Sequence, residues 1–367
     1  MSKLGPRDLK DLALPSGWDA ATLELWRLQD GTTYEAVMSR MINSVSMFNS
    51  ALDGHSCLPA ITSTTTRQEV RYRESGGATW GLHTEYQIPD ENRAEMTGHM
   101  LPRLKYDCGL GWTWDYLKDA ISEDVDMDIR VFLETALDLF EVQALTRLFK
   151  REEVTGAASG LGSSGYSVPL VRGTGGVIDF TPPPYAGQTF VSTHDHFLYY
   201  STSASAGAAL EAMADHLKEH GHQSPWDVVV SLADIAVYTA LTDFTPVAAE
   251  GIRYGSTQDL AVVGEEYIGV YATDYGTFRV WTSARIPTLY LAGYKTYGRN
   301  DPRNTLRRWY NPRMGDGIVP ISGDKLGYPV QRVYGFAEFG YGIGPDRTNG
   351  VVTYLGSGSS YTTPTIS

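Results

Sequence analysis

The sequence predicts an α+β protein in which helices and strands occupy different stretches of the chain. Two stretches, the first fifty residues and Ser122–Lys150, carry apolar residues every three or four positions, as one-sided helices do. The stretch Thr64–Tyr106 is rich in Thr, Val and Tyr between turn residues, and the chain beyond Gly251 is again rich in strand-forming residues. A length of 367 residues is sufficient for two to three domains.

The composition excludes several classes of protein. Hydrophobic residues make up 42% and charged residues 20%, so the chain is globular and not intrinsically disordered. The net charge of −13 argues against a protein that coats nucleic acid through uniform positive charge. No window approaches 18 consecutive apolar residues and the charged N-terminus is unlike a signal peptide, so we expect a soluble protein made in a cytoplasm. Tyrosine, at 23 residues, outnumbers phenylalanine and tryptophan together, which favours an extensive contact surface.

Three helical regions are predicted in order along the chain. The first region divides into Ser16–Leu28 and a second segment that Thr33 caps. The longest is Ser122–Lys150, with Ser122 as N-cap, acidic residues in its first turns and basic residues at its end. The third runs from Ser205 to His220, and Leu210, Met213, Ala214 and Leu217 are its buried residues.

The segment between the first two helical regions predicts a ribbon of three strands, Thr64–Glu74, Ala78–Ile88 and Glu95–Tyr106. Neither face of its first strand is cleanly apolar: one carries Arg67, Glu69, Arg71 and Arg73, and the other mixes Val70 and Tyr72 with polar residues. A ribbon without a full apolar face is marginal on its own. We therefore expect it to lie on something else, such as a neighbouring molecule.

The C-terminal half predicts a sheet with short helices. Val228–Val230 indicate a buried strand within Trp226–Leu232, and Ile235–Leu241 follows as a short helix. Gly269–Thr273 and Thr277–Trp281 are further strands.

Two weak motifs are best interpreted as structural. The GxGxxG match at Gly160–Gly165 follows a helix and leads into Pro169, so it favours a loop over a nucleotide-binding turn. Cys57 and Cys108 form no CxxC pair, and we interpret them as small buried residues in a reducing compartment.

Two stretches of opposite charge stand out. Residues 121–141 hold seven acidic residues and one basic residue, whereas 295–313 hold six basic residues and one acidic residue. Because aromatic residues are interleaved with the basic ones, a nucleic-acid interface is one interpretation of 295–313. We favour the other, in which the two stretches meet across a subunit boundary, because the overall charge of the protein is negative.

Histidines provide the one candidate for metal chemistry. His194 and His196 have HxH spacing, and His216 and His220 are four residues apart on one predicted helix. Four such imidazoles would suit zinc. The competing interpretation, which we favour, places His216 and His220 on the polar flank of a surface helix, next to Lys218 and Glu219. No HExxH motif places a general base between metal ligands.

The order of these parts resembles the major capsid protein of tailed bacteriophages, whose fold is shared with encapsulin shells and the herpesvirus capsid floor. The resemblance is carried by the ribbon Thr64–Tyr106, by the helix Ser122–Lys150, and by Tyr267–Ala272 leading to Ile286-Pro287. It implies an N-terminal arm, an extended β-loop, a long spine helix, and peripheral and axial domains. The corresponding divisions are 1–61 for the arm, 62–112 for the β-loop, 113–200 for the peripheral domain, 201–324 for the axial domain, and 325–367 for the return to the peripheral domain and the tail.

The function that the resemblance implies is structural and not enzymatic. Copies would assemble as hexamers and pentamers into an icosahedral shell around double-stranded DNA, without reading its sequence. The implied location is the virion, assembled in the host cytoplasm, with portal, scaffolding and decoration proteins as further partners, no membrane, no cofactor and no metal. The expected inter-subunit contacts are Arg67, Glu69, Arg71, Arg73, Glu123, Asp124, Asp126, Arg299, Arg303, Arg307 and Arg308.

Two alternatives stay open. One is an encapsulin-like compartment that has the same fold but encloses an enzyme cargo. The other is a zinc-dependent hydrolase that uses His194, His196, His216 and His220. A hydrolase would be a compact monomer or small oligomer.

Overall fold

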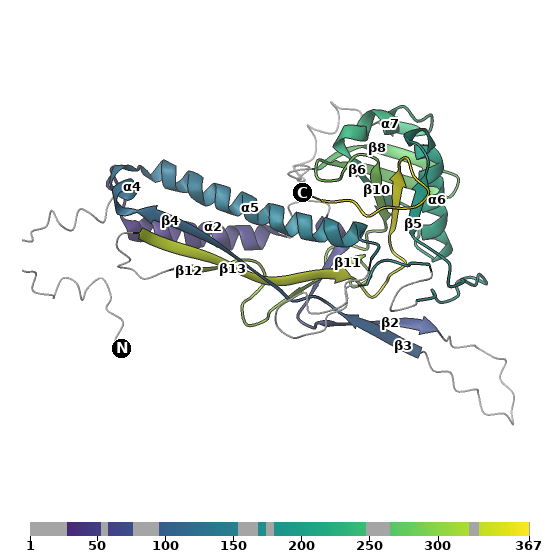
Figure 1. Ribbon diagram of the computed structural model, residues 1–367, viewed down its shortest axis with the longest axis horizontal. Coiled ribbons are helices and arrows are strands. Elements are labelled where there is room, and N and C mark those ends of the chain that lie inside the picture. The colour runs from purple at the N-terminus through teal and green to yellow at the C-terminus, as the bar shows by residue number, and fades with distance from the viewer. Residues whose placement is uncertain are drawn as a thin grey trace, which may run out of the picture. The chain divides into compact units, whose positions relative to one another are not determined.

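The computed structural model describes residues 28–52, 58–75, 95–152, 168–173, 180–246, 265–322 and 330–366 (Figure 1). The chain forms two compact units, each built from separate segments. The small unit comprises Met1–Phe48, Asp107–Thr135 and Val319–Phe336, and the large unit comprises Asn49–Tyr106, Ala136–Ile318 and Ala337–Ser367. Among the described residues, no helix is long and apolar enough to cross a membrane.

Helices α2 and α5 supply the apolar interior of the small unit. Helix α2 (Tyr34–Ala51) begins as predicted, because Thr33 Oγ1 accepts a hydrogen bond of 3.3 Å from the Ala36 N–H. Its apolar residues Val37, Met41 and Val45 are buried. Helix α4 (Trp114–Asp119) follows β4 (Leu104–Thr113).

Helix α5 (Ser122–Phe149) confirms the predicted spine. Its 28 residues correspond to a rod of about 42 Å at 1.5 Å per residue. Its start differs slightly from the prediction, since Ser122 is already helical and donates its N–H to Asp30 Oδ2 at 2.9 Å. The Ile121 N–H donates to Asp124 Oδ2 at 3.1 Å, so aspartates accept hydrogen bonds from two amides at the start of the helix.

Strand β13 (Val330–Ile343) contributes to both units. In the small unit, its first residues pair antiparallel with β12 (Val319–Ser322), and β4 also pairs with β13. In the large unit, its last residues pair antiparallel with β11 (Leu306–Tyr310), which pairs in parallel with β1 (Thr62–Thr65) after the short helix α3 (Leu58–Ile61).

A seven-stranded sheet forms the centre of the large unit. Its order is β5 (Phe197–Tyr200), β14 (Val351–Leu355), β10 (Tyr290–Tyr294), β6 (Trp226–Ser231), β9 (Gly276–Ser283), β8 (Glu265–Thr273) and β7 (Phe244–Pro246). Helix α6 (Ala206–Glu219) packs its predicted apolar residues, all fully buried, into the core of this sheet. The predicted strand around Val228–Val230 and the short helix α7 (Ile235–Thr239) are confirmed.

Strands β2 (Glu69–Ser75) and β3 (Glu95–Met100) pair antiparallel and form the base of the predicted ribbon. Val70 is buried with Leu101 and Trp309, and Tyr72 is buried with Val171 and Phe180. The expectation that another molecule must cover this face is therefore wrong for the described part of the ribbon, because the large unit covers it with its own residues.

The last two described strands, β13 (Val330–Ile343) and β14 (Val351–Leu355), are not paired with each other, since they lie in different sheets. Cys108 is exposed, so its interpretation as a buried residue is wrong. The predicted elements Ser16–Leu28 (except its last residue) and Ala78–Ile88, the glycine motif Gly160–Gly165 and Cys57 lie outside the described residues.

Buried His99 predicts loss of stability in acid. Burial, together with the positive charges of Arg347, Arg147 and Arg307, lowers the pKa of His99 to about 3 from the ordinary value of 6.5. Between pH 6.5 and 3, His99 is protonated in the unfolded chain but neutral in the folded chain. The free energy of unfolding therefore falls as the pH drops from 6.5 towards 3. The slope from one such histidine is about 1.4 kcal/mol per pH unit.

The measurement is urea unfolding of the unassembled chain at several pH values, compared with His99→Gln. Glutamine retains an N–H donor for the Ile343 carbonyl, which lies 3.1 Å from His99 Nε2, but does not titrate. The variant should lose stability less steeply in acid than the unaltered chain. Equal slopes for the two proteins would contradict this assignment.

Candidate functional site

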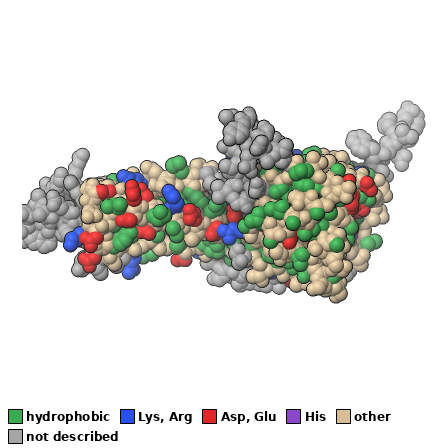
Figure 2. Space-filling view, turned by 90° about the horizontal axis from the view of Figure 1, so that it is seen from above, with side chains coloured by type: hydrophobic (Ala, Val, Ile, Leu, Met, Phe, Trp, Pro, Cys, Tyr) green, Lys and Arg blue, Asp and Glu red, His purple; other side chains and the backbone are tan. Residues whose placement is uncertain are grey.

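The small unit presents large apolar side chains to solvent. On helix α5, Met127 and Val131 are 56% and 51% exposed, and on helix α2, Ile42 and Met47 are 50% and 71% exposed. Met127 and Val131 are four residues apart and so lie side by side on the helix. Figure 2 shows apolar side chains between acidic and basic ones over this part of the molecule. Exposed apolar side chains of this size are typical of a surface that another protein covers.

The acidic contact residues predicted from the sequence precede this apolar pair in the first turns of α5. Glu123, Asp124 and Asp126 are all exposed at the start of α5. Asp126 lies 3.3 Å from Arg40 of α2, and both side chains are about half exposed. An ion pair this exposed contributes little to the stability of the subunit, so these charges are available to a neighbour.

On strand β2, the charged residues lie on the exposed side. Arg71 Nε lies 2.8 Å from Glu69 Oε1, with the two side chains 66% and 55% exposed, and Arg67 is also exposed. This pair raises the pKa of the Arg71 guanidinium and lowers that of the Glu69 carboxyl. The side chain of Arg73 lies outside the described residues. Alternation along the strand thus separates the buried residues from the charged ones.

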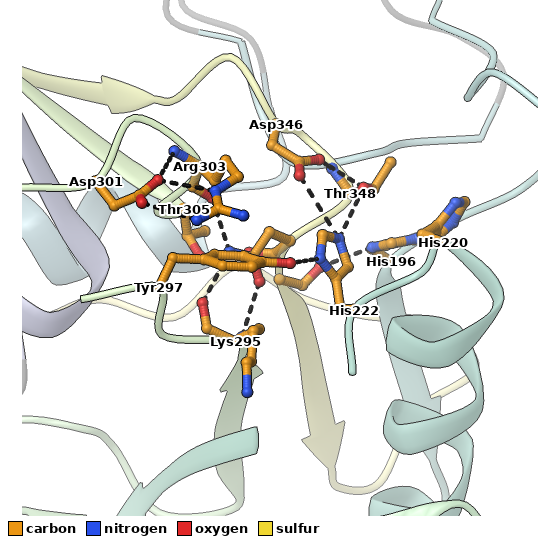
Figure 3. A network of polar contacts seen from close by, with 12 residues as sticks. His196, His220, His222, Lys295, Tyr297, Asp301, Arg303, Thr305, Asp346 and Thr348 are labelled. Atoms are coloured by element: carbon orange, nitrogen blue, oxygen red, sulfur yellow. Dashed lines mark hydrogen bonds and ion pairs between the residues drawn. The ribbon is translucent and has the colours of Figure 1, made fainter. Parts of the chain in front are cut away.

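The basic stretch 295–313 belongs to the large unit, and several of its side chains are held by contacts within that unit. Arg303 pairs with Asp301 at 2.9 Å and lies over the Tyr297 ring, 4.1 Å from its centroid. The Tyr297 hydroxyl lies 2.7 Å from His222 Nδ1, and His222 Nε2 lies 3.0 Å from Thr348 Oγ1 (Figure 3). Tyr297 is therefore enclosed by a polar network of its own subunit.

The aromatic residues of this stretch bear on the nucleic-acid interpretation. Tyr294 and Trp309 are buried, and the Tyr297 ring is already covered by Arg303. Stacking on unpaired bases requires exposed rings, which these three residues do not offer.

Of the four basic contact residues predicted here, Arg308 differs from the rest. Its side chain is 3% exposed, Nη2 donates to Asp316 Oδ2 at 2.7 Å, and the guanidinium lies over the Phe140 ring. Arg308 therefore serves the fold of its own subunit, and we no longer propose it as an inter-subunit contact. Arg299 and Arg303 are exposed, and Arg307 is half-buried in β11, where burial lowers its pKa.

The histidines form a compact cluster in the large unit. His194, His196 and His220 bring their Nε2 atoms within 2.9–3.1 Å of one another, and Glu219 Oε1 lies 3.2 Å from His194 Nε2. The four ligand atoms lie within 4.8 Å of one another. His194 and His196 precede β5, while Glu219 and His220 end α6.

Burial sets the charge of this cluster. It lowers the pKa of His194 to about 4 and that of His220 to about 3, and nearby imidazoles lower them further. The pKa of fully buried His196 is also well below its usual value, whereas burial and Asp215 raise the pKa of Glu219 to about 7. At neutral pH the three rings are therefore uncharged, so their contacts with Glu219 are not ion pairs.

Only part of this cluster could be predicted from the sequence. The prediction that His220 lies on the polar flank of a surface helix is wrong, because its side chain is 2% exposed. His216, predicted as a fourth ligand in the zinc alternative, directs Nδ1 to the Ala212 carbonyl at 2.8 Å and is not in the set of converging ligand atoms. Glu219 was missed, although its position beside His220 was a visible signal.

Comparison with known proteins supports the fold. The sequence matches no protein-family model and no curated protein. A solved structure from Mycobacterium phage Patience aligns with a TM-score of 0.63 and 21% identity, covering 94% of this chain and 94% of that chain. A capsid structure of the cyanophage P-SCSP1u aligns with a TM-score of 0.49 and 9% identity, covering 81% of this chain and 86% of that chain. A virus-like particle from Pyrococcus furiosus aligns with a TM-score of 0.40 and 13% identity, covering 87% of this chain and 98% of that chain. The chain therefore has the α+β capsid fold of tailed bacteriophages, as the sequence resemblance predicts.

Proposed function

We propose that this chain is a major capsid protein whose copies assemble as hexamers and pentamers into an icosahedral shell that encloses double-stranded DNA in a virion. The observation that carries the proposal is the alignment of nearly the whole chain with a phage protein of known structure. This fold indicates a structural role in preference to an enzymatic one. We also propose that the five divisions 1–61, 62–112, 113–200, 201–324 and 325–367 are the functional segments of the subunit.

The surface chemistry of the small unit supports assembly. Met127 and Val131 are exposed beside acidic residues of α5, and a second copy of the chain is the partner that we propose for them. Burying these side chains at an interface removes apolar surface from water, and the flanking charges fix the orientation of the partner. Arg67, Glu69, Arg71, Arg73, Arg299, Arg303 and Arg307 stay predictions as further contacts.

The direct test is electron microscopy of the purified full-length chain. Closed shells of uniform diameter are the expected result. Dispersed monomers or small oligomers under all assembly conditions would overturn the proposal and favour the hydrolase alternative. In particles isolated from their source, nuclease-resistant double-stranded DNA is expected, whereas a protein cargo would identify an encapsulin-like compartment.

A substitution on α5 tests the proposed contact surface. We expect Val131→Glu to abolish shells, because a carboxylate at a closed apolar contact loses its water without gaining a partner, a cost of about 1–3 kcal/mol in every copy. Val131 is 51% exposed, so the unassembled subunit should unfold at the same temperature as before. Val131→Ala is the matched control and should still form shells. Normal assembly of Val131→Glu would exclude this surface.

A further inference from the structure

The three clustered histidines cannot satisfy one another by hydrogen bonding. A ring nitrogen either donates through an N–H or accepts through a lone pair. The three Nε2 atoms make three mutual contacts, at 3.1 Å for His194 with His196, 2.9 Å for His194 with His220, and 3.0 Å for His196 with His220. Among three atoms with only two roles, at least two must have the same role, so at least one of these contacts is repulsive.

The position of one proton in the cluster follows from its partner. His196 Nδ1 lies 2.7 Å from the Gly350 carbonyl oxygen, which can only accept, so Nδ1 carries the proton. The Nε2 atom of the neutral His196 ring therefore holds a lone pair directed at the other two nitrogens. His196 and His220 lie side by side next to the His222 network (Figure 3). A backbone carbonyl that fixes a histidine in this tautomer is the usual outer partner of a metal ligand.

Glu219 adds a carboxylate oxygen to the three nitrogens of the cluster. Its Oε1 atom is inaccessible to solvent and has no hydrogen-bond partner among the described residues, although it lies 3.2 Å from His194 Nε2 and 3.8 Å from His220 Nε2. A buried carboxylate oxygen without a hydrogen bond is costly, unless a cation compensates for it. A repulsive nitrogen contact and an unsatisfied oxygen thus occur at the same point.

The dimensions fit a tetrahedral metal ion. With metal–nitrogen bonds of 2.0–2.1 Å, tetrahedral ligands lie about 3.3 Å apart. The three Nε2 atoms lie 2.9–3.1 Å apart, and Glu219 Oε1 lies 3.2 Å from His194 Nε2 and 3.8 Å from His220 Nε2. Four protein ligands fill a tetrahedral shell and leave no position for a catalytic water. Phe190 covers one side, with its ring centroid 4.2 Å from that of His220 and 5.1 Å from that of His194.

Two neighbouring polar residues are held elsewhere and are not ligands. Asp195 accepts from Arg151 Nη2 at 2.7 Å and from the Phe197 N–H at 2.9 Å. His216 is stacked on His194, with ring centroids 5.2 Å apart, and bonds the backbone of its own helix. His216 therefore provides a control residue that shares the surroundings of the cluster but not its function.

We propose that His194, His196, His220 and Glu219 bind one divalent transition-metal ion, with Zn²⁺ as the ion that three imidazoles and one carboxylate favour, in a closed structural site. The ion joins the segment before β5 to the C-terminal end of α6, two parts of the large unit that are separated by the whole of helix α6. The site stabilises the subunit and takes no part in a reaction. It does not depend on the proposed capsid function.

The test is metal analysis of the full-length chain purified without a histidine tag, before and after saturation with Zn²⁺ and removal of the excess. We expect one zinc per chain, and a drop in Tm of roughly 3–5 °C on chelation, the shift that corresponds to loss of a ligand held at about 100 times its Kd. Added Zn²⁺, but not Mg²⁺, should restore the Tm. Co²⁺ in place of Zn²⁺ should give the intense visible absorption of a tetrahedral site.

Variants locate the ion. His194→Gln and Glu219→Gln should lower zinc affinity at least tenfold, whereas His216→Gln should bind one zinc with unchanged affinity. If a ligand variant fails to fold, the cobalt spectrum and the chelation experiment on the unaltered chain still test whether the chain holds a tetrahedral metal site. Absence of stoichiometric zinc after saturation, or equal zinc affinity in the His194→Gln and His216→Gln variants, would overturn the proposal.

Discussion

Replacing Arg347 with methionine should destabilise the subunit by about 3–5 kcal/mol and abolish the recovery of soluble folded chain at elevated temperature. Arg347 is 1% exposed, and its guanidinium donates to the Pro169 carbonyl at 3.0 Å, the Leu170 carbonyl at 3.4 Å and the Tyr72 hydroxyl at 3.3 Å. It also lies over the Phe180 ring, 4.6 Å from its centroid. Methionine fills most of this volume but supplies no donors, so two buried carbonyls lose their partners.

The measurement for Arg347→Met is urea unfolding of unassembled chains. Arg313→Met is the matched control, because Arg313 is exposed in the same unit and its loss should change the unfolding midpoint little. If Arg347→Met unfolded at the same urea concentration as the control, the hydrogen bonds of Arg347 would not be important for stability.

A single added methyl group at Gly340 should also destabilise the subunit, though by less than Arg347→Met. Gly340 lies in β13 opposite Trp309 of β11, and a Cβ atom there would collide with the backbone carbonyl of Pro102. Backbone atoms cannot turn aside as a flexible side chain can, so β13 would have to shift away from its neighbours. We expect Gly340→Ala to cost about 1–3 kcal/mol and to lower the yield of shells.

Gly358→Ala is the control for this substitution. The nearest atoms to an added Cβ at Gly358 lie 3.8 Å or more away, which is ordinary contact. This variant should be neutral or slightly stabilised, since alanine restricts the unfolded chain. Thermal unfolding followed by circular dichroism compares the two, and a Gly340→Ala midpoint equal to that of Gly358→Ala would contradict the close approach.

The helices could be predicted from the sequence because they depend on the spacing of apolar residues that are close together in the chain. Helix α5 follows from its apolar residues and from the acids in its first turn, and the buried face of α6 follows from Leu210 and its neighbours. The covering of β2 could not be predicted. Val70 meets Trp309, and Tyr72 meets Phe180, and nothing local in the sequence relates residues so far apart.

The histidine cluster also depends on contacts that the spacing of residues in the sequence does not predict. Four-residue spacing suggested that His216 and His220 act together, as they would on an uninterrupted helix. Helix α6 ends at Glu219, however, and Gly221 follows with a φ of 88°, so the chain leaves the helix at His220. The ring of His220 then lies beside His194 and His196, while His216 bonds its own helix.

The two sides of strand β2 are subject to different evolutionary constraints. Val70 and Tyr72 must suit partners within the same polypeptide, so a change at either one requires a compensating change elsewhere in that chain. Glu69 and Arg71 face outward and bind only each other among the described residues, so their identities can drift without harm to folding. Among related chains we therefore expect the inward positions of this strand to be conserved and the outward positions to diverge between lineages.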